Sequence, residues 1–255
     1  GNKMYYLPIL GAFASATGTI LQKKFLKHKN ANPRTYQVIE FSAIILILLP
    51  FLYFFWGVKS QAFSLINIFI LIAVVGISVC ANFFTLYSMK GDKVSNLEPA
   101  KAMEPLFTVV LAILFSFIFG TALYDRNFGV IILAFIAVLA LVLSHIKKHH
   151  LRFNKYFIAA IIGSFFFALE LVISKLILNQ YTPISFYFIR CLGILILSIF
   201  IFKPKNLGKI VKDNKIEFIL LGISWVAYRV ILYYGYLNLG IVSTTLIVML
   251  APVFI

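Results

Sequence analysis

Acidic residues are scarce in this chain of 255 residues: Asp and Glu together number 8, against 23 Lys and Arg. Charged residues of both signs make up only 12% of the sequence, whereas a soluble domain has about 25%. So few charges cannot cover the surface of a soluble fold of this length. The sequence also has no phosphate-binding glycine loop, nucleophile elbow or metal-ligand pair, so we expect neither an enzyme nor a bound metal or other cofactor.

Cysteine is almost absent. The chain has two, Cys80 and Cys191, and both lie inside apolar segments. A cysteine in such a place is usually a small buried residue. The pair therefore indicates no disulfide framework and no redox compartment.

Apolar residues fill the space that charges leave. They make up 62% of the chain and gather into segments of about 20 residues, the length of a membrane-spanning helix. This pattern predicts a multi-pass protein of the cell membrane, with the lipid bilayer as its surroundings. The helices that we expect are 4–26, 35–57, 64–89, 94–119, 126–146, 154–179, 183–203, 215–238 and 240–255.

The two halves of the chain resemble each other. GAFASATGTILQKKFL (11–26) aligns with GSFFFALELVISKLIL (163–178), and NPRTYQVIEF (32–41) aligns with TPISFYFIRC (182–191). Each match is weak, but further matches follow in the same order. Together they predict a duplicated unit of five helices.

A unit with an odd number of helices forces its second copy to enter the membrane upside down. We therefore expect an all-α, polytopic membrane protein made of two inverted five-helix repeats. The first repeat covers 1–146, a basic linker covers 147–153, and the second repeat covers 154–255. The second copy lacks its fifth helix, so we expect a tenth helix beyond residue 255.

The basic residues lie mostly in short loops. A formal net charge of +15 could indicate nucleic acid, but basic loops between apolar spans are better explained as orientation signals, and we expect no nucleic-acid partner. The loop after the first helix is rich in lysine and its repeat counterpart, NQYTP, has none; the second pair of loops shows the opposite bias. This reversal fits oppositely oriented copies. It predicts an N-terminus outside the cell.

Two short motifs recur in both halves. A proline opens the second helix of each unit (Asn32-Pro33 and Thr182-Pro183), and the fourth helix carries Pro105-Leu106-Phe107 or Pro252-Val253-Phe254. With the repeat plan, these motifs resemble the EamA-like family of the drug/metabolite transporter superfamily, over almost the whole chain. The resemblance implies ten helices, alternating access and a central substrate cavity. It also implies cytoplasmic termini, so family and loop charges disagree on orientation.

One face of the eighth predicted helix carries the strongest candidates for a binding site. Trp225, Tyr228, Arg229 and Tyr236 recur at helical spacing, and Arg229 lies near mid-span. The matching face of the third helix carries Ser78, Asn82 and Thr85. A guanidinium among aromatic rings suits the carboxylate or phosphate of a solute. The alternative is that Arg229 pairs with Glu170.

Several other charges lie in the predicted spans. Glu98, Lys101 and Glu104 are spaced so that Lys101 can reach both carboxylates along one helix. They form either a gate or proton site at the cavity mouth, or a ladder solvated by lipid headgroups. Glu170 is a candidate proton acceptor. Glu40 and Arg190 occupy equivalent repeat positions with opposite charge, and a structural ion pair is the simpler role for Arg190.

These observations favour a secondary transporter of small polar metabolites, such as an amino acid or organic anion, working by alternating access. Substrate would bind at Arg229 and its neighbours, and Glu104 or Glu170 could couple transport to protons. The alternatives are an exporter of lipophilic cations and, less well supported, a membrane-embedded enzyme or lipid-handling protein. Monomer and dimer both stay open.

Overall fold

The computed structural model describes residues 6–27, 32–120, 153–205 and 207–248, with isolated residues at 124, 129, 132, 135, 136, 139, 140 and 143. Helices dominate this part of the chain. In order they are α1 (Tyr6–Leu26), α2 (Pro33–Phe55), the 3-10 turn η1 (Ser60–Phe63), α3 (Leu65–Gly91), α4 (Val94–Lys101), α5 (Met103–Phe119), α7 (Lys155–Leu178), α8 (Pro183–Phe202), α9 (Leu207–Asp213), α10 (Lys215–Asn238) and α11 (Ile241–Val248).

Most predicted spans agree with these helices to within two residues. Most of the predicted helix over 126–146, most of the linker at 147–153 and the last residues of the predicted span 240–255 lie outside the described residues. In the described part, six segments are long and apolar enough to cross a membrane: α2, α3, α4 with α5, α7, α8 and α10. The chain is therefore a multi-pass, all-helical membrane protein.

Local sequence explains where α2 and α8 begin. Each has a proline as its first helical residue, where the missing N–H costs nothing. The preceding Asn32 and Thr182 accept hydrogen bonds from the backbone N–H groups of Arg34, at 3.1 Å, and Ser185, at 3.4 Å. The duplicated proline motif is thus a duplicated helix start.

The predicted helix over 94–119 is interrupted at Ala102, and its two parts together form one of the six candidate spans. Ala102 lies between α4 and α5 with φ −64° and ψ −13°. Pro105 has no N–H to donate to the carbonyl of Lys101, so the regular ladder of hydrogen bonds cannot run through this point. The three charges around the break are consequently not on one straight helix.

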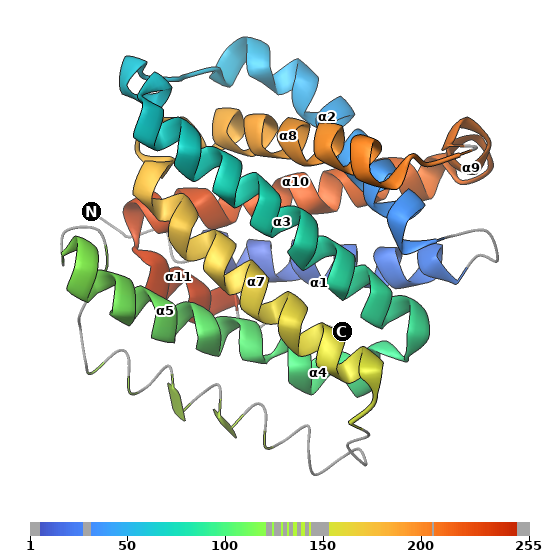
Figure 1. Cartoon of the computed structure of the whole chain (residues 1–255), viewed down its shortest axis with the longest axis horizontal. Helices are drawn as coiled ribbons and strands as arrows, with labels where there is room; N and C mark the ends of the chain where they lie inside the picture. The colour runs from blue at the N-terminus through green and yellow to red at the C-terminus, as the bar shows by residue number, and fades with distance from the viewer. Residues whose placement is uncertain are drawn as a thin grey trace.

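Helices of the first half of the chain pack against helices of the second half. α2 lies against α8, and the strand-like contacts of Lys59 N with Gln180 O, at 2.8 Å, and Thr182 N with Gly57 O, at 2.9 Å, join the end of one to the start of the other. α3 lies along α7, and α1 lies along α10 (Figure 1). Under the predicted repeat, α3 corresponds to α10 and α7 corresponds to α1. The α3–α7 pair is therefore the counterpart of the α10–α1 pair. The arrangement suits an inverted repeat, which itself stays a prediction.

The end of the bundle where α1 and α3 finish and α7 and α10 begin, here called the basic end, is joined by polar contacts. Lys23 donates to the carbonyls of Met89 and Asp92, and Asn154 donates to the Asp92 carboxylate at 2.8 Å. Lys24 lies 2.6 Å from Glu217 on α10. These contacts join α1, α3, α7 and α10 at this end of the bundle.

The outer surface is apolar, as a lipid-facing surface must be. Tyr53, Phe54 and Phe200 are each more than 70% exposed, with values of 87%, 75% and 72%. The buried interior, by contrast, contains several charged side chains. Soluble proteins show the opposite pattern, with charged side chains outside and apolar ones inside.

Candidate functional site

A cavity of about 100 Å³ lies among the helices of the bundle. Side chains of α1, α2, α3, α7, α8 and α10 line it, together with Lys101 and Glu104 on either side of the Ala102 break. The helices that surround it come from both halves of the chain. A polar cavity inside an apolar bundle is the usual form of a transport or binding site in a membrane protein.

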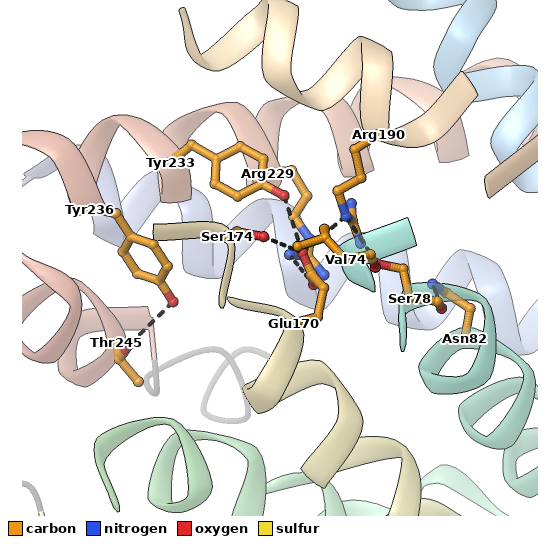
Figure 2. A network of polar contacts seen from close by, with 10 residues as sticks. All are labelled: Val74, Ser78, Asn82, Glu170, Ser174, Arg190, Arg229, Tyr233, Tyr236 and Thr245. Carbon is orange, nitrogen blue, oxygen red and sulfur yellow. Dashed lines mark hydrogen bonds and ion pairs between the residues drawn. The ribbon is translucent and has the colours of Figure 1, made fainter. Parts of the chain in front are cut away.

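Three charged residues form a cluster at one side of this cavity (Figure 2). Glu170 on α7 is fully buried; its Oε1 lies 3.0 Å from Nε of Arg190, and its Oε2 lies 3.1 Å from Nη1 of Arg229. Ser174 Oγ donates to Oε1 at 3.2 Å, and the Tyr233 hydroxyl lies 3.5 Å from the same oxygen. Two guanidinium groups share one carboxylate, so the cluster carries one excess positive charge.

Arg229 is therefore both paired and exposed to the cavity. The pair with Glu170 that the sequence left as an alternative is present, yet Arg229 still lines the cavity. The rings of Phe167 and Tyr228 lie 5.6 Å and 5.8 Å from its guanidinium carbon. A guanidinium has five N–H donors, and in the described part of the chain Glu170 is the acceptor for one of them. The others remain available to a ligand.

The other residues predicted to bind substrate divide into two groups. Trp225, Tyr228, Asn82 and Thr85 line the cavity with Arg229. Ser78 does not; it accepts a hydrogen bond from Arg190 at 3.2 Å and so supports the cluster from α3.

Tyr236 also lies away from the cavity. Its hydroxyl is 3.4 Å from that of Thr245 on α11 (Figure 2), and its backbone oxygen accepts a hydrogen bond from Lys175. The shared helical face was correctly identified, but Tyr236 is two turns beyond Arg229, past the end of the cavity.

The candidate gating residues are also separated. Lys101 and Glu104 line the cavity, whereas Glu98 is buried elsewhere with 7% exposure. In the described part of the chain no ion pair within 4.0 Å joins Lys101 to either carboxylate, although both still attract it electrostatically. The predicted ladder of ion pairs is thus not formed among these residues: Glu98 and Lys101 share α4 without an ion pair, and Glu104 lies beyond Ala102 on α5. Nor does Glu98 reach out to headgroups.

Sequence reasoning missed the wall that α1 contributes. Ser15, Thr19 and Gln22 line the cavity, and Gln22 Nε2 donates to Glu40 Oε1 at 3.1 Å. Their spacing of four and three residues places them on one helical face. That signal was present in the sequence. It was obscured by the small residues around it, which suggested only helix packing.

The helices that carry the charged cluster lie in a segment that is similar to a known protein family. Residues 154–255 match the EamA-like transporter family. This confirms the resemblance over the segment that contains α7, α8, α10 and α11. No curated protein matches the chain. Glu170, Arg190 and Arg229 all lie in this segment, so the charged cluster is in the part of the chain that is similar to a transporter family.

Proposed function

We propose that this protein is a secondary transporter of small polar solutes that bear a carboxylate, such as amino acids or organic anions, working by alternating access. The observation that carries the proposal is the placement of Arg229. It lines a cavity among the helices, and in the described part of the chain Glu170 accepts one of its five N–H donors. The EamA-like segment supports transport over an enzymatic role.

The charge of the cluster favours an anionic group. Glu170 neutralises one of the two arginines, and the remaining positive charge is held where water is largely excluded. A solute carboxylate would complete the charge balance and accept the free N–H groups of Arg229. Phe167 and Tyr228 would restrict the guanidinium to orientations that face the ligand.

Proton coupling, where it occurs, is better assigned to Glu104 than to Glu170. Glu170 is held by two guanidinium groups, which stabilise its charged form. Glu104 lines the cavity and has no ion pair within 4.0 Å in the described part of the chain. A carboxylate in that position can exchange a proton with solvent as the cavity opens.

The test is transport in proteoliposomes made with the purified chain. Wild type should take up labelled amino acids or organic acids, and Arg229→Lys should lower kcat/KM by about tenfold or more, because lysine keeps the charge but loses the fork of donors. Lys24→Gln, at the basic end, is the control and should transport normally. Uptake that survives Arg229→Lys unchanged would remove the proposed role of Arg229. Uptake of lipophilic cations alone would favour the alternative exporter.

A further inference from the structure

Glu40 on α2 is a buried carboxylate that forms no ion pair with a described residue. It is 3% exposed and lines the cavity. Gln22 Nε2 donates to Oε1 at 3.1 Å, but Oε2 has no hydrogen-bond partner among the described residues. No described basic side chain lies within 4.0 Å of it. Its Oε2 is thus an unused acceptor facing the cavity, and a cationic group of a ligand would stabilise the charged carboxylate there.

Aromatic rings border the same place. Trp225 and Tyr228 line the cavity in an edge-on arrangement, with ring centroids 5.8 Å apart. The indole N–H of Trp225 lies near the Glu40 carboxylate, yet its Nε1 has no partner within hydrogen-bond distance and angle among the described residues. Aromatic faces beside a carboxylate are the groups that proteins use to bind ammonium ions.

Gly18 makes room for this arrangement. A Cβ at this position would lie 3.0 Å from Trp225 Cε2, closer than a normal contact. The absence of a side chain lets the indole rest directly on α1, one turn before Gln22. In the predicted repeat, Gly18 aligns with Glu170, and Glu40 aligns with Arg190.

We propose that Glu40, Gln22 and Trp225 form an ammonium subsite, so that the cavity binds a zwitterion. The ammonium group of the solute would donate to Glu40 Oε2 and lie against the Trp225 ring. Its carboxylate would lie at the basic cluster around Arg229. This inference rests on the proposed function for the carboxylate end, and it narrows the substrate class from organic anions to amino acids and similar zwitterions.

Ammonium binding can be measured without transport. The chain has two tryptophans, so a Trp56→Phe background reports on Trp225 alone by fluorescence. Titration with isobutylamine hydrochloride at neutral pH and constant ionic strength should give a saturable change. Glu40→Gln should raise the apparent Kd by about tenfold or more, because the ammonium group loses its acceptor. Glu217→Gln, the same change at the basic end, should leave it unaltered.

The subsite would be overturned by no saturable change in the Trp56→Phe protein, by an unchanged Kd in Glu40→Gln, or by an equal response to sodium chloride. Glu40→Asp guards against a folding defect, since it keeps the charge with a shorter reach. It should bind isobutylamine more weakly than the parent but more tightly than Glu40→Gln. Equal affinities for both variants would also contradict the proposal.

A transport arm separates this inference from the proposed function. Proteoliposomes are given each standard L-amino acid, then the best substrate is compared with its deaminated acid. Wild type should prefer the zwitterion, and Glu40→Gln should reduce that preference by about tenfold. Acid uptake without any preference for the amino acid would refute the subsite and keep the proposed function. Amine binding without transport of any solute would refute the proposed function and keep the ammonium subsite.

Discussion

At the scale of single residues, Glu170 sets the net charge beside the cavity because it pairs with two arginines. The sequence marked Glu170 and Arg229 as a possible pair, but it did not show that Arg190 would join them. Arg190 is 1% exposed, so its charge can be tolerated only beside a counter-ion. Glu170 supplies that counter-ion for both guanidinium groups.

Replacing Glu170 should therefore be costly. Glu170→Gln keeps the shape but leaves two buried guanidinium groups without a counter-charge, and it should destabilise the fold by about 3–5 kcal/mol. Ser174→Ala removes one neutral donor to the same carboxylate and should cost only about 1 kcal/mol. Unfolding in detergent, followed by circular dichroism, compares the two. Equal stability of Glu170→Gln and wild type would show that the shared ion pair contributes nothing.

At the scale of helices, close contacts depend on glycine at particular places. A Cβ at Gly222 on α10 would lie 2.9 Å from the carbonyl oxygen of Ala43 on α2, and backbone cannot move aside as a side chain can. At Gly76 on α3 a Cβ would meet nothing within 4 Å. Both glycines are helical, but Gly222 lies against backbone whereas Gly76 faces open space.

They make a matched pair of substitutions. Gly222→Ala should push α10 away from α2 and destabilise the protein by about 1–3 kcal/mol. Gly76→Ala should be neutral or stabilise it by about 0.5–1 kcal/mol, because alanine is the better helix former. Thermal unfolding of both variants beside wild type tests this. A stable Gly222→Ala protein would mean that the two helices do not approach so closely.

The junction of α1, α3 and α7 depends on Asp92. Partial burial acts to raise the pKa of Asp92, but hydrogen bonds from Asn154, Asn96 and the backbone N–H of Lys93, with the charge of Lys23, hold it below its ordinary value. A carboxyl whose pKa is lowered by folding stabilises the protein above its ordinary pKa, near about 3.9. That contribution is lost as the pH falls through the lower, folded value.

Asp92→Ala should thus lower the melting temperature at neutral pH, and the difference from wild type should shrink below about pH 4. Melting curves at both pH values measure this. Asp213→Ala, on the nearby helix α9, controls for loss of an acidic residue at the same end. A difference that stays constant with pH would indicate that Asp92 acts through packing and not through its charge.

At the scale of the whole molecule, the structure brings distant basic segments to one end. Lys23 and Lys24 of α1, Lys90 of α3 and Lys155 of α7 lie there, and the opposite end carries Lys59 in the link before η1. Figure 1 shows α9 at the same end as the start of α2. The positive-inside rule predicts that the basic end faces the cytoplasm.

Cysteine labelling tests this orientation. In a Cys80→Ala, Cys191→Ala background, Ser60→Cys should react with an impermeant maleimide added to intact cells. Lys93→Cys should react only after the membrane is permeabilised. The opposite pattern would put the N-terminal end of α1 inside the cell, as the family resemblance implies.

The sequence by itself determined the membrane class, most helix bounds and the face of α10 that carries Arg229. These follow from apolar length, proline-headed helix starts and helical spacing, all of which are local properties of the chain. Only the tertiary structure decided which charges meet. Arg190 joins Glu170, Tyr236 turns to Thr245, and Glu98 is buried away from the cavity that Lys101 lines. The reason is physical: a buried charge is positioned by partners on other helices, and no periodicity within one helix records which helix will pack against it.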